Sequence, residues 1–98
     1  MAALNVVRFR VKPNMEQVFL DAHREGKAAW PGLTRGLILD AGERTFVLVG
    51  EWPDMGILAG ARERMIETLN SFRHALEDLG PGRGVTDAVS GKVVLTLK

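Results

Sequence analysis

The pattern of apolar and polar positions is clearest over Thr45–Leu79, where it predicts a strand followed by a long helix. Residues 45–52 (TFVLVGEW) are largely apolar on both sides of the chain, which is typical of a strand buried on both faces. The pair Pro53-Asp54 ends that strand. The apolar residues that follow recur at steps of three and four, as on one side of a helix: Ala61, Met65, Leu69, Phe72, Leu76 and Leu79. Gly80-Pro81 then predicts the end of this helix.

The N-terminal part of the chain predicts a strand and a shorter helix. Leu4–Val11 alternates so that Asn5, Val7, Phe9 and Val11 share one side. After it, Asn14 followed three residues later by Gln17 is typical of a helix N-cap. A helical stripe comes next, formed by Met15, Val18, Phe19, Ala22, Gly26 and Ala29. Trp30-Pro31-Gly32 predicts the turn that ends this helix.

Three more strands complete the predicted order. Leu33–Asp40 alternates and is separated from Thr45–Trp52 by a short polar turn, which predicts an antiparallel hairpin. After the long helix, Val85–Val89 predicts a short strand, Ser90-Gly91 a turn, and a final strand is marked by Val93, Leu95 and Leu97. The order indicates an α+β fold with the ferredoxin-like β-α-β-β-α-β arrangement. We expect one domain over residues 1–98.

The number of helices predicts a partner for the sheet. Two helices can cover only one side of a four-stranded sheet, yet Thr45–Trp52 is apolar on both sides, with Phe46, Leu48 and Trp52 on one and Val47 and Val49 on the other. Leaving such a face in water is unfavourable. We therefore expect a homodimer. The alternative is a partly exposed sheet that tolerates a few apolar residues.

Composition narrows the classes of partner and compartment. The formal net charge is +1, so no electrostatic argument supports binding to nucleic acid or to an anionic membrane. The chain has no cysteine, which excludes disulfides and thiolate chemistry, and no pair of histidines has the spacing of metal ligands. The start of the chain has no signal-peptide pattern, and no apolar run approaches the ~20 residues of a membrane span. We expect a cytoplasmic protein without a metal or another cofactor.

Several short segments resemble the antibiotic biosynthesis monooxygenase domain. They are Pro31-Gly32-Leu33, the hairpin turn 40–44, the strand Phe46–Trp52, and Ser71-Phe72-Arg73, and the resemblance runs from about Val6 to Leu79. It implies a ferredoxin-like unit that dimerises through its sheets into an α+β barrel, with a pocket between helices and sheet. Proteins of this family include cofactor-free quinol and polyketide oxygenases, haem-degrading enzymes and members without an assigned reaction.

The chain also departs from the family's patterns. Asn70-Ser71-Phe72 stands where many members have Pro-His-Phe on the second helix. Haem-degrading members combine an Asn on the first strand with a Trp and a His ten residues apart on that helix. Asn5 and His74 fit two of these positions, but Arg64 occupies the place of the tryptophan. We therefore exclude haem degradation.

Two arginines on the long helix are candidates for binding an anionic ligand. At about 100° per residue, Arg62 and Arg73 lie roughly 20° and 40° from Leu69 at the centre of the apolar stripe. They either reach over the pocket edge to pair with a phenolate or carboxylate, or lay their aliphatic stems along the core and keep their charges in water. His74 lies roughly 140° away, on the polar side, and is a weaker candidate.

Other residues suit a pocket of this kind. Asn5, on an apolar strand face, either bonds nearby backbone or orients a ligand. Trp30 and Trp52 are expected to pack in the core, and Trp52 is the better candidate for lining a pocket. His23 has no marked partner at helical spacing and is expected to be exposed.

These observations leave two functional hypotheses. The first is a monooxygenase that oxidises a small aromatic or quinol-type substrate with molecular oxygen in an apolar pocket, without metal or flavin. The substrate's own anion then reduces oxygen, and the protein binds, deprotonates and excludes water. The second is a non-catalytic, homodimeric module that binds or senses a small apolar or aromatic ligand, because the same fold supports many functions.

Overall fold

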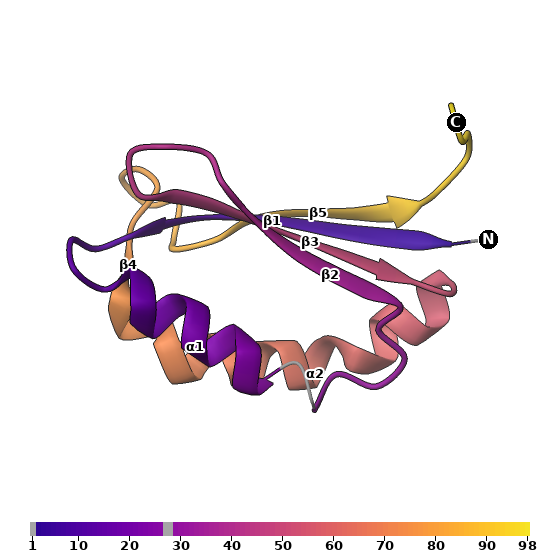
Figure 1. Cartoon of the computed structure of the whole chain (residues 1–98), viewed down its shortest axis with the longest axis horizontal. Coiled ribbons are helices and arrows are strands. Elements are labelled where there is room, and N and C mark those ends of the chain that lie inside the picture. Colours follow the sequence, from indigo (N-terminus) through magenta and orange to yellow (C-terminus); the bar gives the residue numbers. More distant parts are fainter. Residues whose placement is uncertain (1, 27–28) are drawn as a thin grey trace.

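The computed structural model describes residues 2–26 and 29–98, which form one antiparallel sheet with helices on one face (Figure 1). The strands are β1 (Ala3–Val11), β2 (Arg35–Asp40), β3 (Thr45–Trp52), β4 (Leu76–Glu77) and β5 (Asp87–Lys92). Their order is β2-β3-β1-β4, and β5 also pairs with β1. Because β4 and β5 pair with successive parts of β1, the two together fill the fourth strand position. The predicted α+β, ferredoxin-like fold is confirmed.

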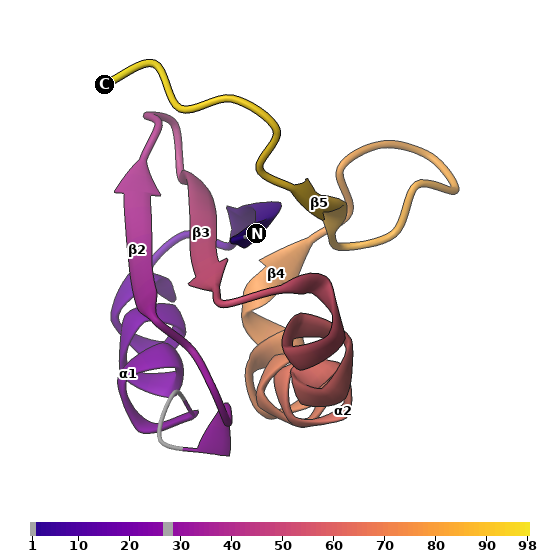
Figure 2. The same cartoon turned by 90° about the vertical axis from the view of Figure 1, so that its right-hand side faces the viewer.

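Both helices lie on the same face of the sheet. α1 (Glu16–Gly26) lies beneath β2 and β3, and α2 (Met55–Phe72) lies beside it, towards β4 and β5 (Figure 2). α2 begins with a side-chain cap, since Asp54 Oδ1 accepts a hydrogen bond of 2.8 Å from the Ile57 amide. A short 3₁₀ helix, η2 (Arg73–Ala75), follows α2. None of the described helices lies on the opposite face of the sheet (Figure 1).

The core forms where the helices meet the inner face of the sheet. The β1 residues predicted to share one side do face the helices, together with buried side chains of β3. Phe19 of α1 is in contact with three other phenylalanines, and the ring centroids are 5.2–5.3 Å apart: Phe9, Phe46 and Phe72. The contacts with Phe9 and Phe72 are edge-to-face and the contact with Phe46 is tilted, and aromatic packing of this kind adds to the stabilisation from burial. The four phenylalanines therefore form the aromatic part of the core, at the end of the sheet that contains Phe9.

The predicted helix end at Leu79 is wrong. α2 stops at Phe72, and Leu76 is a buried strand residue that pairs with Val11. The Lys12 amide also donates to the Ala75 carbonyl, over 2.8 Å. Because residues four apart, such as Phe72 and Leu76, share a side in a helix and also in a strand, the stripe alone could not locate this change. Tertiary pairing with β1 decides it.

The predicted C-terminal strands are confirmed only in part, since β5 contains residues 87–89 of the predicted strand Val85–Val89. β5 runs straight through Ser90-Gly91, where a turn was predicted, and Val93–Lys98 follows without strand structure. The pairing of Asn5 with Ser90 and of Leu4 with Gly91 holds this segment extended. Ser90-Gly91 is typical of a turn by composition, but the hydrogen-bonding partners that β1 supplies keep it in a strand.

The beginning of α1 differs from the prediction as well. Asn14 has a φ of 67°, in the left-handed region, and lies in a turn before the first helical residue, Glu16. It therefore does not act as the predicted N-cap, because a cap residue is extended. At the other end, the predicted stripe continues to Ala29, and its course over residues 27–28 lies outside the described residues.

Candidate functional site

A cavity of about 380 Å³ lies between the inner face of the sheet and α2. Its volume is in the range of small-molecule sites. The lining is mostly apolar, with a few polar side chains at its two ends. The residues are Asn5, Val7, Phe9, His23, Trp30, Leu48, Leu58, Arg62, Met65, Ile66, Thr68, Leu69, Phe72, Thr86, Ala88, Val89 and Ser90.

At one end, the side chain of Asn5 is fixed by hydrogen bonds. The Trp52 indole Nε1 donates to Asn5 Oδ1 over 2.7 Å, and Asn5 Nδ2 donates weakly to the Met65 sulfur over 3.7 Å. Asn5 is buried, yet it lines the cavity. Because sulfur is a weak acceptor, the amide N–H groups retain donor capacity for a ligand oxygen. Asn5 is therefore an oriented donor at the cavity wall.

Trp52 supports this site from behind. It is fully buried and is not among the cavity-lining residues, so its role at the site is to hold the Asn5 amide. Trp30, expected to be a core residue only, is buried and also lines the cavity, and its Nε1 donates to Thr68 Oγ1 over 2.9 Å. Each of the two indoles thus orients a polar side chain that lines the cavity.

The absence of a side chain at Gly50 leaves room for the hydrogen-bonded side chains of Asn5 and Trp52. It lies opposite Asn5 in the β1–β3 register, and a Cβ atom at this position would collide with Asn5 Oδ1 and lie 3.0 Å from Trp52 Nε1. We expect Gly50→Ala to displace the Asn5 amide and to lower the free energy of unfolding by roughly 1–3 kcal/mol, as overpacking does. Urea unfolding measures this change.

Gly60 provides the matched control for that substitution. It lies within α2, and a Cβ atom built there meets nothing within 4 Å. Gly60→Ala is expected to raise the free energy of unfolding by up to about 1 kcal/mol, because glycine is unfavourable inside a helix. If Gly50→Ala is as stable as the unsubstituted protein, the space at Gly50 does not hold the amide in place.

Arg62 lies at the rim of the same end. It is exposed on α2 and lines the cavity, and its Nη2 donates to Ser90 Oγ of β5 over 3.4 Å. Within residues 2–26 and 29–98 it forms no ion pair with a carboxylate. A guanidinium without a carboxylate partner beside an apolar cavity is suited to an anionic oxygen of a ligand. The structure thus places two of the candidate residues, Asn5 and Arg62, on the wall of one cavity.

The structure does not bring the other predicted candidates to the cavity. Arg73 is exposed in η2 and donates to Asn70 Oδ1 through Nε and Nη2, over 3.4 and 3.2 Å. His74, the weaker candidate, is exposed beside it. Neither is among the lining residues. Both follow the end of α2, so the helical rotation used to place His74 does not apply.

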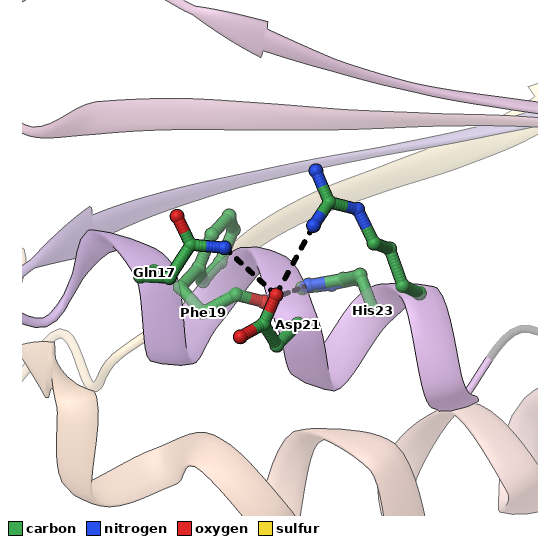
Figure 3. A network of polar contacts seen from close by, with 5 residues as sticks. Gln17, Phe19, Asp21 and His23 are labelled. Carbon is green, nitrogen blue, oxygen red and sulfur yellow. Dashed lines mark hydrogen bonds and ion pairs between the residues drawn. The ribbon is translucent and has the colours of Figure 1, made fainter.

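His23 is the functional candidate that sequence reasoning missed. It was expected to be exposed, but its side chain is buried, and desolvation lowers its pKa from the ordinary value of 6.5. Its Nδ1 lies 2.9 Å from the Phe19 carbonyl oxygen (Figure 3). The available signal was its position four residues after Phe19, which places both on one side of α1.

A second cavity, of about 390 Å³, lies between α1 and β2. Three residues line both cavities and therefore form the wall between them: His23, Trp30 and Leu48. Arg24 and Arg35 also line the second cavity. Within the described parts of the chain, no aspartate or glutamate lines either cavity. The charged groups around this space are thus all arginines.

In residues 2–26 and 29–98, no group of three His, Cys, Asp or Glu side chains is placed to hold a metal ion. None of the helices described here has the length and apolar character needed to cross a membrane. The first cavity and its polar ends are the best-defined candidate site.

Solved structures with this fold include oxygenases. A protein from Nitrosomonas europaea assigned as an antibiotic biosynthesis monooxygenase is similar with a TM-score of 0.76 and 17% identity, over 95% of this chain and 90% of that one. A point variant of SnoaB, a cofactor-independent oxygenase from Streptomyces nogalater, is similar with a TM-score of 0.71 and 18% identity. The match covers 98% of this chain and 96% of that one. A conserved protein from Methanosarcina mazei is similar with a TM-score of 0.76 and 16% identity, over 94% of this chain and 92% of that one.

These likenesses concern the fold. No protein-family model matches the chain, and no curated protein matches it in sequence. The chain has the fold of the antibiotic biosynthesis monooxygenase structures, at identities below one residue in five. Its activity must therefore be argued from its own cavity.

Proposed function

We propose that this protein binds a small aromatic or quinol-type molecule in the first cavity and promotes its oxidation by molecular oxygen, as a monooxygenase without metal or flavin. The observation that carries this proposal is the pairing of an apolar cavity with the fixed amide of Asn5 and the guanidinium of Arg62. An aromatic anion in an apolar space needs such donors, because an unpaired buried charge is unfavourable. Apolar side chains form the cavity walls, and Asn5 and Arg62 supply the hydrogen-bond donors for the anion.

The chemistry of such a substrate requires little from the protein. An electron-rich aromatic anion transfers electrons to oxygen directly. When a ring CH₂ group becomes C=O, one oxygen atom enters the substrate, the other leaves as water, and the substrate supplies all four electrons. The chain's residues would bind the ring, stabilise the anion and exclude water. The lining by Val7, Leu48, Leu69 and Phe72 suits that exclusion.

The fold is compatible with this activity. SnoaB, which shares the fold, is a cofactor-independent oxygenase. Since one fold carries many functions, this likeness supports the proposal only alongside the cavity. A non-catalytic binding module would use the same cavity, so the experiment must separate binding from turnover.

Oxygen uptake tests the proposal. Purified protein is mixed with a panel of hydroquinones, naphthols and anthrones under air, with an anaerobic control and a metal chelator. Protein-dependent uptake that survives the chelator and yields an oxygenated product supports the monooxygenase. Binding without turnover across the panel would favour the binding module, and the absence of binding would reject the site.

We expect Arg62→Gln to weaken the binding of an acidic phenol roughly fivefold, or about 1 kcal/mol, because an exposed guanidinium is partly screened by water. Arg73→Gln provides the matched control, since Arg73 is exposed on η2 and does not line the cavity. Fluorescence titration, using the indoles near the site, measures both affinities. Equal losses in the two variants would show that the effect of Arg62 is one of net charge only.

A further inference from the structure

One ring nitrogen of His23, Nδ1, is hydrogen-bonded within α1. A carbonyl oxygen only accepts hydrogen bonds, so the 2.9 Å contact with the Phe19 carbonyl requires the proton on Nδ1. In neutral imidazole the other nitrogen, Nε2, then carries a lone pair. Among the residues that the structure describes, no donor is hydrogen-bonded to Nε2. The ring therefore holds an unused acceptor on a cavity wall.

The surroundings of His23 keep it neutral. Its ring centroid is 4.6 Å from that of Phe19, 4.7 Å from Phe72, 5.9 Å from Phe9 and 6.2 Å from Trp30. Burial in this aromatic setting lowers the pKa of His23. The imidazole is therefore uncharged near neutral pH and available as a proton acceptor.

The charged groups that face this space are all cations. They are Arg62 of α2 in the first cavity, and Arg24 of α1 and Arg35 of β2 in the second. The neighbouring carboxylate on α1, Asp21, accepts hydrogen bonds from Gln17 and Arg24 at the exposed side of the helix (Figure 3). Nothing among the described residues therefore pairs with a protonated His23 before an anion enters.

His23 and Asn5 lie at opposite ends of the first cavity. His23 packs against Phe9, which follows Asn5 by four residues on β1. At the rise of a strand, this separation is about 13 Å between backbone positions. A ligand with oxygens on opposite sides of its ring system suits both ends.

We propose that His23 Nε2 accepts the hydroxyl proton of an aromatic ligand whose opposite polar end is held by Asn5 and Arg62. The ligand's O–H bond breaks, an Nε2–H bond forms, and the electron pair stays on the aromatic oxygen. The imidazolium and the aromatic anion then neutralise each other inside the cavity, which offsets the burial of both charges. This inference rests on the proposed function and assigns its proton acceptor.

The test uses 4-nitrophenol, whose nitro group and hydroxyl lie at opposite ends of one ring and whose ionised form has its own absorbance band. The probe is titrated with protein at a pH about half a unit below its own pKa, where about a quarter of the free probe is ionised, and the ionised fraction of the bound probe is read from the spectrum. His23→Phe keeps an aromatic ring without an acceptor. His23→Asn keeps a donor for the Phe19 carbonyl and removes the second nitrogen. Circular dichroism establishes that each variant is folded.

His74→Gln is the matched control, because His74 is exposed and does not line the cavity. We expect the ionised fraction to rise roughly threefold on binding to the unsubstituted protein and to His74→Gln. It should not rise with either His23 variant. An equal rise with His23→Phe and His23→Asn would overturn the inference and leave the proposed function standing, since another group would then accept the proton.

Two other outcomes are equally decisive. If the unsubstituted protein binds the probe in its un-ionised form, His23 is an aromatic core residue and accepts no proton. If no form of the protein binds 4-nitrophenol or any phenol of the panel, the proposed function fails, and this inference fails with it. The affinity and the ionised fraction come from the same titration, so the two failures are separated.

Discussion

Replacing Phe19 with alanine is expected to lower the free energy of unfolding by about 3–5 kcal/mol. Its side chain is fully buried, and its ring contacts Phe9, Phe46 and Phe72 as well as His23. Truncation would leave a void bounded by aromatic rings on both the sheet and α2, and rings held from two sides cannot easily collapse into it. The whole free energy of unfolding of a native protein is only about 5–15 kcal/mol, so this loss is a large share of it.

Equilibrium unfolding in urea, followed by circular dichroism, measures this effect. Val18→Ala is the control, because Val18 precedes Phe19 in α1 and is 39% exposed. That substitution should change stability by no more than about 0.5 kcal/mol. A loss below about 1.5 kcal/mol in Phe19→Ala would contradict the assignment of Phe19 to the centre of the core.

The second large effect is expected at the outer face of the sheet, which we propose to be a homodimer interface. One row of side chains crosses four strands there and is entirely apolar: Val89, Val6, Val49 and Leu37. Leu37 and Val89 are 44% and 67% exposed in the single chain. Leu39, on the next row, is 50% exposed. A contiguous apolar surface of this kind favours association with a second copy.

We expect the unsubstituted protein to sediment at twice its 10.7 kDa chain mass, and Val49→Lys to sediment at the chain mass. A lysine in the middle of that row would bury a charge without a partner. Ala59→Lys makes the same change of charge at an exposed position on α2 and should remain a dimer. Sedimentation equilibrium at micromolar concentration compares the three proteins. A soluble, folded monomer of the unsubstituted chain would reject the interface.

Sequence periodicity was sufficient for the strands that lie inside the sheet. Thr45–Trp52 was predicted with the bounds that β3 has, and the β1 residues that were predicted to share one side, Asn5 and Phe9 among them, do share it. In a strand, the period of two fixes which residues share a side. Where one side is buried, a change of register by one residue would expose all of its apolar residues. The apolar pattern in the sequence therefore fixes which side of the strand faces the core.

The elements at the sheet edge were decided by tertiary pairing. Leu76 continues the helical stripe in sequence, but pairing with Val11 makes it a strand residue. Ser90-Gly91 has turn residues, but the free edge of β1 holds it extended. A local preference is weak compared with the hydrogen bonds that a neighbouring strand offers. No single-sequence pattern shows where that neighbour will lie.

For the site, the sequence determined the residue types, and the tertiary structure decided how they are combined. An amide on an apolar strand face and two arginines beside a helical stripe were visible as candidates, and the fold brought Asn5 and Arg62 together while it left Arg73 in water. His23 lies on the buried side of α1, but its burial depends on rings from β1 and α2. A cavity and the burial of a polar side chain are properties of several elements at once. Helical and strand periods describe each element alone, which is why only the folded chain reveals them.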